Sequence, residues 1–380
     1  MSFRVYIMAA GLGTRLYPLT GRTSKPMVPI LNRPVMEHLL RLLRRHGARE
    51  MAANLHYHPD KIRTYFGDGS ALDVALRYNL ENELQGTAGG ASAFREFLAG
   101  GTFVVVSGDG LTDIDLTAFV AAHRASGGIA TMAVKQVDDP SLYGVVVHDD
   151  AGRITGFQEK PPAAEALSDL CNCGIYACEP AIFDYVPTGT FVDWAKDVFP
   201  ALLADGVPFY RWRLETYWND VGNIEQYRLS NFDALLGRVK LDVPGREIAP
   251  RVWVGEGTQI EPGVRLEPPV LLGAGCLVET EAELIGPLIV GDGCVIERGA
   301  VLEGVINWDG VKAGRGARLA GSILGRNVTV HHEAVVHEDA VIGDRSDVAA
   351  HALVAAGARF EPRSYVGPDD VLGGLADDED

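Results

Sequence analysis

The chain has 380 residues, of which 47% are hydrophobic and 22% are charged, and its formal net charge is −17. This length exceeds one compact core of ordinary size and predicts two domains. The acidic balance argues against binding nucleic acid or anionic membranes, and no apolar run is long enough to span a bilayer. We see no signal peptide, and the odd number of cysteines favours reduced thiols, so we expect a cytoplasmic protein.

The first two thirds of the chain alternate strand-like and helix-like segments. The short apolar runs RVYIMAA and TFVVVSGD predict strands. Helices are predicted over 32–47, with Asn32 as N-cap and Gly47 at the end, and over 223–237. This alternation predicts a Rossmann-like α/β domain with a largely parallel sheet, whose ligands lie beyond the carboxyl ends of its strands.

A glycine-rich loop follows the first predicted strand. Gly11 and Gly13 would let backbone N–H groups approach a phosphate, and Arg15 and Lys25 would add positive charge. The third glycine of a dinucleotide-binding fingerprint is replaced by Leu16, and no Gly-Lys-Ser/Thr closes an ATPase P-loop. The loop therefore indicates phosphate binding but excludes both of those protein classes.

The stretch CNCGIYAC reads as a strand with three cysteines. Alternation along a strand places Cys171 and Cys173 on one face and Asn172 and Gly174 on the other. No further ligand stands at a metal-binding spacing, so we expect these thiols to pack in the core.

From about residue 250 aliphatic residues recur every six positions. One run extends from Val254 to Leu302 and a second from Leu324 to Phe360, with a phase slip near Asp309. Each hexapeptide predicts one side of a left-handed parallel β-helix whose aliphatic residue points inward. The expected parts of the chain are an α/β domain at 1–237, a linker at 238–251, a β-helix at 252–361 and an acidic tail at 362–380.

Motifs along most of the chain resemble those of the sugar-1-phosphate nucleotidyltransferases. The quoted stretches are GLGTRLYPLTGRTSKPMVPILNRPVMEHLL, FGDGSALDVALRYNLENELQGTAGGA, VVVSGDGLTDIDL, YGVV, GFQEKP, CNCGIY, DWAKDVFPALLADG and WNDVGNIEQY. The resemblance implies that 1–237 transfers a nucleotidyl group from an NTP to a sugar 1-phosphate, giving an NDP-sugar and pyrophosphate, with Mg²⁺ as cofactor.

The same resemblance implies roles for individual residues. The catalytic residues would be Arg15, Lys25 and Asp109, and the metal ligands Asp109 and Asp220. The nucleotide would be bound by Ala10, Gly11, Gly13, Thr14, Gln85, Gly86 and Thr87. The sugar phosphate would be bound by Tyr143, Gly144, Glu159, Lys160, Asn172, Gly174 and Lys196.

The motifs indicate the type of reaction more specifically than they indicate the substrates. YFGDGS and QGTAG, joined to a long β-helix, are most similar to mannose-1-phosphate guanylyltransferases, so we expect GTP and mannose 1-phosphate. Glucose-1-phosphate thymidylyl-, uridylyl- and adenylyltransferases and heptose-phosphate guanylyltransferases share the same chemical residues. Gln85 stands where the family usually has Leu, which leaves the choice of base open.

Two other hypotheses about function remain open besides nucleotidyl transfer. One is a silent relative that binds a sugar nucleotide and regulates a partner, which would be favoured by loss of the catalytic residues. The other gives the β-helix an acyltransferase activity, since such coils sometimes carry a catalytic histidine. We expect instead that the β-helix joins subunits into a homo-oligomer or closes one end of the active site.

Overall fold

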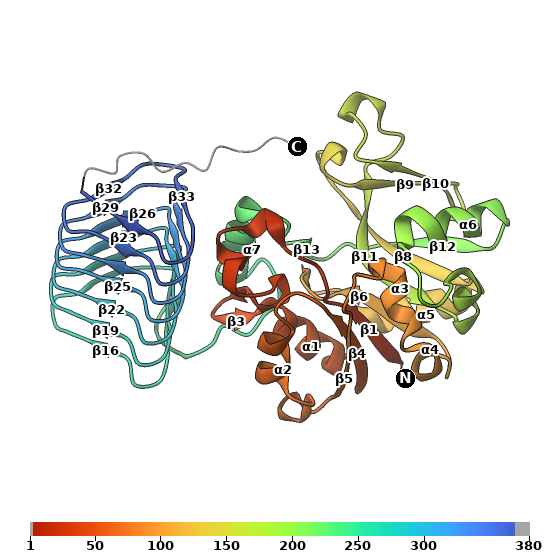
Figure 1. The fold of residues 1–380 in the computed structure, drawn as a ribbon, viewed down its shortest axis with the longest axis horizontal. Helices are drawn as coiled ribbons and strands as arrows, with labels where there is room; N and C mark the ends of the chain where they lie inside the picture. The colour runs from red at the N-terminus through yellow and green to blue at the C-terminus, as the bar shows by residue number, and fades with distance from the viewer. Residues whose placement is uncertain (1–2, 369–380) are drawn as a thin grey trace. The chain divides into compact units, whose positions relative to one another are not determined.

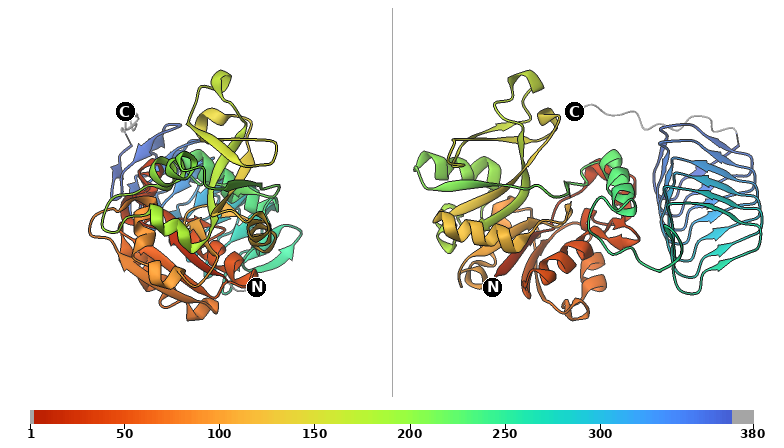
Figure 2. Two further views of the ribbon diagram at one scale, coloured as in Figure 1. Left: turned by 90° about the vertical axis from the view of Figure 1, so that its right-hand side faces the viewer. Right: turned by 180° about the vertical axis from the view of Figure 1, so that it is seen from behind.

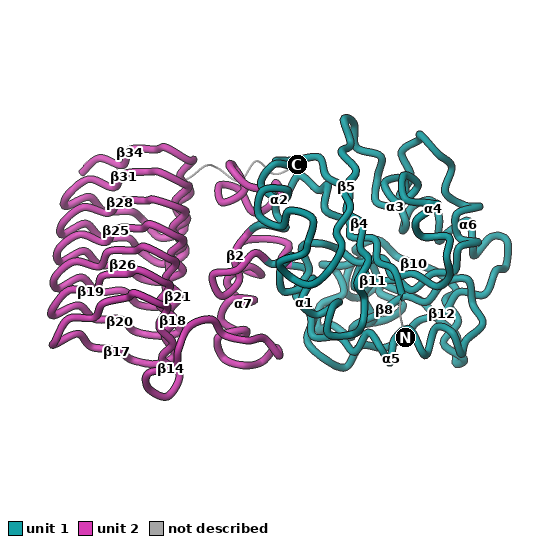
Figure 3. Tube along the Cα trace, turned by 90° about the horizontal axis from the view of Figure 1, so that it is seen from below, with its two compact units in different colours: residues 1–12, 24–27, 35–220 teal, residues 13–23, 28–34, 221–380 magenta. Residues whose placement is uncertain are grey.

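The computed structural model describes residues 3–368, so most of the predicted acidic tail, residues 369–380, lies outside the described part. The chain divides into two compact units, which are described separately (Figure 3). Unit 1 comprises residues 1–12, 24–27 and 35–220, and unit 2 comprises residues 13–23, 28–34 and 221–380. Within 3–368, none of the helices is both long and apolar enough to cross a membrane.

Unit 1 is built on a nine-stranded sheet (Figure 1). Its order is β10-β9-β11-β6-β1-β4-β5, with β8 beside β11 and β12 beside β8. The central strands β6, β1, β4 and β5 are parallel, whereas β11 runs antiparallel to β6. The bounds are β1 Arg4–Met8, β4 Glu50–Leu55, β5 Ala75–Leu80, β6 Phe103–Ser107, β8 Ala130–Gln136, β9 Gly144–His148, β10 Ile154–Glu159, β11 Leu170–Cys178 and β12 Phe209–Arg213. The predicted α/β class is confirmed, and the two predicted strands are the neighbours β1 and β6.

Helices cover both faces of this sheet and form two apolar layers. Successive residues of β1 face opposite sides, so Val5 belongs to the same buried cluster as Leu39 and Tyr6 to the cluster that contains Phe199. Both faces of the central strands are therefore buried, as expected for parallel strands. The helices are α1 Val35–Arg45, α2 Pro59–Phe66, α3 Gly86–Ser92, α4 Arg95–Leu98, α5 Leu116–Ser126 and α6 Phe199–Ala204 in unit 1, and α7 Ile224–Leu235 in unit 2.

The predicted cap of the first helix was wrong. Asn32 lies at the tip of a hairpin formed by β2 (Pro29–Ile30) and β3 (Arg33–Pro34), and α1 begins only at Val35. Leu31 and Asn32 have φ angles of 47° and 61°. A two-residue hairpin turn requires positive φ at both positions, and Asn tolerates this conformation well, whereas Leu adopts it only when its surroundings hold it there.

Unit 2 contains a three-sided coil of short parallel strands (Figures 1 and 2). One row begins with β14 Arg246–Ala249, which pairs antiparallel with β15 Val252–Val254. It continues with parallel strands through β18 Val270–Leu272, β21 Leu288–Val290, β24 Ile306–Asn307, β27 Ile323–Leu324, β30 Val341–Ile342 and β33 Arg359–Phe360. The second is β16 Gln259–Ile260, β19 Leu277–Val278, β22 Val295–Ile296, β25 Lys312–Ala313, β28 Thr329–Val330, β31 Asp347–Val348 and β34 Tyr365–Val366. The third is β17 Arg265–Glu267, β20 Glu283–Ile285, β23 Val301–Glu303, β26 Arg318–Ala320, β29 Val335–Val336 and β32 Leu353–Val354. Hexapeptide sides with buried aliphatic residues are thus present, as predicted.

The phase slip reflects two shortened coils. Val270 pairs with Leu288, eighteen residues later, but Ile306 pairs with Ile323, only seventeen residues later. Spacing returns to eighteen where Ile323 pairs with Val341. Shortening a coil by one residue shifts the inward positions, which explains why a strict six-residue period fails in this region.

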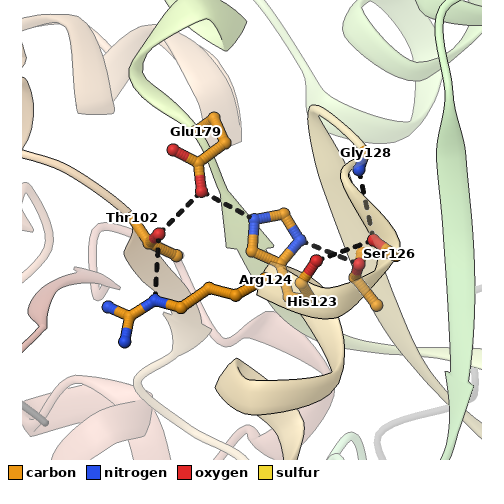
Figure 4. A network of polar contacts seen from close by, with 7 residues as sticks. Thr102, His123, Arg124, Ser126, Gly128 and Glu179 are labelled. Atoms are coloured by element: carbon orange, nitrogen blue, oxygen red, sulfur yellow. Dashed lines mark hydrogen bonds and ion pairs between the residues drawn. The ribbon is translucent and has the colours of Figure 1, made fainter.

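A buried histidine links the amino end of β6 to the end of β11 (Figure 4). His123 of α5 is fully buried, with Nδ1 2.9 Å from Thr131 Oγ1 and Nε2 3.2 Å from Glu179 Oε1. Thr102 donates to the same Glu179 oxygen at 2.6 Å and accepts from Arg124 Nε at 3.3 Å. Burial lowers the pKa of His123, although the nearby Glu179 carboxylate opposes this change.

Because His123 is buried, we expect the free energy of unfolding to decrease in mild acid. Because the folded-state pKa lies below the unfolded value of about 6.5, the unfolded chain binds the proton first as the pH falls. The free energy of unfolding should therefore be fully retained above about pH 6.5 and should decline below it. Chemical denaturation between pH 7.5 and 5 should show a shallower decline in His123→Gln than in the wild type, and an equal decline in both proteins would contradict this role of His123.

Candidate active site

A two-stranded ribbon brings the two predicted metal ligands to one place. β7 (Leu111–Thr112) pairs antiparallel with β13 (Trp218–Asn219), and Leu111 lies opposite Asn219. Asp109 lies just before β7, beyond the carboxyl end of β6, and Asp220 follows β13. The pairing of these short strands is what places carboxylates 111 positions apart in the sequence at the same site.

Both aspartates line a pocket of about 180 Å³ in unit 1. Five predicted site residues share its wall: Asp109, Tyr143, Asn172, Gly174 and Asp220. The wall also contains residues that were not predicted, namely Ser107, Gly110, Cys173 and Trp218. The pocket therefore joins the predicted metal ligands to part of the predicted sugar site.

Lys25 pairs with one of these carboxylates. Its Nζ lies 2.7 Å from Asp109 Oδ2 and donates to the main-chain oxygen of Asp220 at 3.0 Å. Burial opposes ionisation of Asp109, but the Lys25 ammonium and hydrogen bonds from Lys25 and Ser107 outweigh it and hold the pKa of Asp109 below its ordinary value. The site thus keeps the Asp109 carboxylate ionised and in contact with Lys25.

The sugar-side wall departs from simple strand alternation. β11 is irregular between Asn172 and Tyr176, where Gly174 takes a φ of 68°. Asn172 Oδ1 accepts from Gly174 N at 2.9 Å, and Asn172 Nδ2 donates to Tyr176 Oη at 3.0 Å. Cys173 is buried as expected, but this irregularity also brings it to the pocket wall, where its carbonyl accepts from Trp218 Nε1 at 3.0 Å.

Two aromatic rings close one side of the pocket. The ring centroids of Tyr143 and Trp218 are 5.8 Å apart. Burial, with a smaller contribution from the Asp220 carboxylate, raises the pKa of Tyr143 to about 12. The phenol is therefore a neutral hydrogen-bond donor at physiological pH.

Three further sugar-side residues, Gly144, Glu159 and Lys160, lie on or next to the β9–β10 ribbon, outside the wall of that pocket. Gly144 pairs with Glu159, and a Cβ at Gly144 would lie 3.4 Å from Glu159 Oε2. Lys160 has a φ of 45° and its N–H donates to Tyr143 O at 3.2 Å. Both charged side chains are exposed, so they are available to a ligand.

The predicted base-binding segment begins α3. Gly86 has a φ of 79°, and a Cβ there would lie 2.4 Å from Val192 O, so only glycine fits this position. Thr87 donates to Asp193 Oδ2 at 2.8 Å and accepts from Trp194 N at 3.0 Å.

Lys196, which is predicted to bind the sugar phosphate, shares a hydrogen-bond partner with this segment. Its N–H donates to Asp193 Oδ1 at 3.1 Å, and its side chain is exposed. The base segment and Lys196 are therefore linked through Asp193, a residue given no firm role from the sequence.

A buried polar chain, which sequence motifs did not reveal, supports the nucleotide side. Ala9 N donates to Asn54 Oδ1 at 2.9 Å, and Asn54 Nδ2 donates to Glu81 Oε1 at 2.7 Å. Gln85 N donates to the other Glu81 oxygen at 3.1 Å. Asn54 and Glu81 are both buried, so this chain fixes the start of the glycine loop relative to Gln85.

The glycine loop is divided between the units. Ala10 is buried and Gly11 is exposed in unit 1, and a Cβ at Gly11 would meet nothing within 4 Å. Gly13, Thr14 and Arg15 belong to unit 2, where Gly13 has a φ of 67° and the side chains of Thr14 and Arg15 are exposed.

Within the described residues, the acidic side chains do not form a cluster of several protein ligands around one metal position. Across residues 3–368, no group of three or more His, Cys, Asp or Glu is arranged to hold a metal ion. Two carboxylates in one pocket suit Mg²⁺, which is commonly bound by one or two carboxylates, water and substrate phosphates.

Comparison with known proteins identifies the two parts of the chain. Residues 4–235 match the family described as Nucleotidyl transferase, and residues 243–343 match the GMPPB C-terminal domain. A UTP–glucose-1-phosphate uridylyltransferase of Synechocystis sp. is 42% identical over 266 residues, covering 66% of this chain and 69% of the relative. A mannose-1-phosphate guanylyltransferase of Mycobacterium tuberculosis is 34% identical over 232 residues, covering 61% of this chain and 64% of the relative.

Solved structures share the fold. HddC from Yersinia pseudotuberculosis superposes with a TM-score of 0.54 at 24% identity, covering 60% of this chain and 98% of that chain. Its complex with GMP-PN gives a TM-score of 0.53 at 24% identity over the same shares. Because the matching family covers more than half of the sequence and agrees with the α/β architecture, the chain belongs to the nucleotidyl transferase family.

Proposed function

We propose that this protein transfers a nucleotidyl group from an NTP to a sugar 1-phosphate, releasing pyrophosphate. The observation that carries the proposal is the shared pocket, whose wall contains Asp109, paired with Lys25, together with Asp220, Asn172 and Tyr143. A silent regulatory relative would have no need to keep these charges in contact, because they serve neither base nor sugar recognition.

The chemistry requires positioning and charge neutralisation rather than a covalent intermediate. A sugar-phosphate oxygen attacks the α-phosphorus of the NTP in line, and the bond to pyrophosphate breaks. Lys25 and Arg15 would bind phosphate oxygens and stabilise the negative charge that spreads in the transition state. Asn172, Tyr143 and the Gly174 backbone would orient the sugar, and Gln85 and Gly86 would present polar groups to the base.

Asp109 and Asp220 would hold Mg²⁺ together with substrate phosphate oxygens. Bound there, the ion would neutralise phosphate charge and help to align the reacting groups. The fit rests on two carboxylates that line one pocket, one of which has a lowered pKa and therefore stays ionised.

For the substrates, we propose GTP and mannose 1-phosphate. The C-terminal match to the GMPPB domain and several mannose-1-phosphate guanylyltransferase relatives, at 31–34% identity, support this pair. A second pair, UTP and glucose 1-phosphate, is favoured by the Synechocystis relative at 42% identity. Gln85, which can hydrogen-bond a base edge with either a donor or an acceptor, is compatible with both.

Pyrophosphate release from purified protein with Mg²⁺ tests this proposal. GTP, UTP, dTTP, ATP and CTP should each be combined with mannose 1-phosphate and glucose 1-phosphate. We expect the GTP–mannose 1-phosphate pair to give the highest kcat/KM. A maximum at UTP and glucose 1-phosphate would select the second pair, and no release from any combination would contradict nucleotidyl transfer to these sugars.

We propose a homo-oligomer in the cytoplasm as the working state. Within residues 3–368, β32, β33 and β34 are the last strands of their rows, and Tyr365 of β34 is 69% exposed, which supports self-association through this end of the coil. All five cysteines are free thiols, which supports a reducing compartment.

A further inference from the structure

One residue of the β-helix breaks the pattern of its coils. The main-chain N–H of Trp308 donates to Leu324 O in the next coil. In five other coils, the residue whose main-chain N–H makes the equivalent bond is a glycine. These glycines are Gly255, Gly273, Gly291, Gly325 and Gly343. A tryptophan is thus present in one coil at a position where five other coils have no side chain at all.

This tryptophan reaches helix α7. Trp308 is 1% exposed, and its Nε1 donates to Tyr227 Oη at 2.8 Å, with the ring centroids 6.4 Å apart. The guanidinium carbon of Arg326 lies over the indole ring, 4.7 Å from its centroid. Burial raises the pKa of Tyr227, so its hydroxyl keeps the proton and can donate onward.

Tyr227 in turn holds the β2–β3 hairpin. Its hydroxyl donates to Pro29 O at 2.8 Å, and Asn231, one turn later on α7, accepts from Leu31 N at 3.1 Å. The neighbouring tip residue Asn32 donates to Val290 O of the coil at 2.7 Å. The two residues with positive φ are therefore fixed by α7 and by the β-helix, which is how a leucine is kept in this unfavourable conformation.

The glycine loop contacts the coil directly as well. A Cβ at Gly21 would lie 2.9 Å from Pro362 Cγ in the last coil and 3.2 Å from the Tyr17 ring. Thr20 Oγ1 donates to Gly13 O at 2.9 Å and closes the loop on itself. Residues 13–23 and 28–34 consequently form one compact unit with the β-helix (Figure 3).

We infer that the β-helix positions the NTP-binding loop, with Trp308 and Tyr227 as positioning residues that act through the hairpin on the segment carrying Arg15. The inference rests on the proposed function, because it assumes that Arg15 binds NTP phosphates. Loosening the contact should weaken nucleotide binding and leave sugar 1-phosphate binding unchanged. A merely structural role would lower stability without this selectivity.

The test compares Trp308→Phe and Tyr227→Phe with wild type in the full-length chain. Hydrogen–deuterium exchange of peptides within residues 13–34 should be about tenfold faster in both variants, because the hairpin opens locally more often. With the nucleotide and sugar phosphate that the wild type uses, KM for the nucleotide should rise about tenfold. The KM for sugar 1-phosphate should stay within about twofold.

Thr258→Val is the matched control within the coil. Thr258 donates to Gly273 O at 2.6 Å and accepts from Cys276 N at 2.9 Å, so the substitution removes coil hydrogen bonds away from the hairpin. Unchanged exchange over 13–34 in both aromatic variants, or an equal increase in Thr258→Val, would overturn the inference. Faster exchange with an unchanged nucleotide KM would also overturn it.

Failure of the proposed function would be distinguishable from failure of this inference. A wild-type protein that releases no pyrophosphate contradicts the reaction. GTP binding by calorimetry would then replace KM: about tenfold weaker binding in both variants supports positioning by the coil, and unchanged binding overturns it.

Discussion

Asp109→Asn should lower kcat for pyrophosphate release by about 10³-fold, equivalent to about 4 kcal/mol of transition-state stabilisation. The amide keeps the size of the side chain but loses the charge that pairs with Lys25 at 2.7 Å and that would attract a cation. Raising the Mg²⁺ concentration should restore little of the rate. Steady-state pyrophosphate release measures the effect directly.

Asp115→Asn is the control for this substitution. Asp115 accepts from Ala118 N at 2.9 Å at the start of α5, a capping role that asparagine fills equally well. Its activity should stay within about twofold of wild type. Equal activity of the Asp109→Asn and Asp115→Asn proteins would remove Asp109 from the mechanism.

Lys25→Gln should lower kcat/KM for the nucleotide by about 10²-fold, the usual effect of removing one group that stabilises transition-state charge. It should also change the pH dependence. Lys25 lowers the pKa of Asp109, so its removal raises that pKa, and the acidic limb of the rate profile should move to higher pH. Rates measured between pH 4.5 and 8 report both effects.

Lys61→Gln provides a matched loss of one positive charge from the exposed surface of α2. It should change neither the rate nor the position of the acidic limb. An acidic limb that stays in place in Lys25→Gln would mean that the ion pair does not set the ionisation of Asp109 during turnover.

The sequence could predict features whose cause is local. Hexapeptide sides repeat within a few residues, so the β-helix was recognisable from periodicity alone. The strands β1 and β6 are short apolar runs with clear ends. The wrong prediction involves a partner that is remote in the sequence. Asn32 suits a helix cap and a hairpin tip equally well, but in the hairpin it donates a hydrogen bond to Val290 O, more than 250 residues later, and that contact cannot be predicted from the local sequence.

The same limit applies to the candidate site. Asp109 and Asp220 were proposed from motifs, but the strands that bring them together have two residues each, too few to show a period. Asn54 and Glu81 are isolated polar residues in otherwise ordinary segments, and only their burial and mutual bond reveal a supporting role. Trp308 was hidden because it lies where the coil pattern slips.

The remote partners of the hairpin have a consequence for synthesis on the ribosome. The hairpin tip at Leu31 emerges long before Trp308, and at translation rates of about 5–20 residues per second the delay is roughly 14–55 seconds. During that time the sheet of unit 1 can assemble, but the loop that carries Arg15 lacks the groups that hold it. A nascent chain would thus acquire its full affinity for nucleotide only after the coil that contains Trp308 has been synthesised, which would delay nucleotide capture until then.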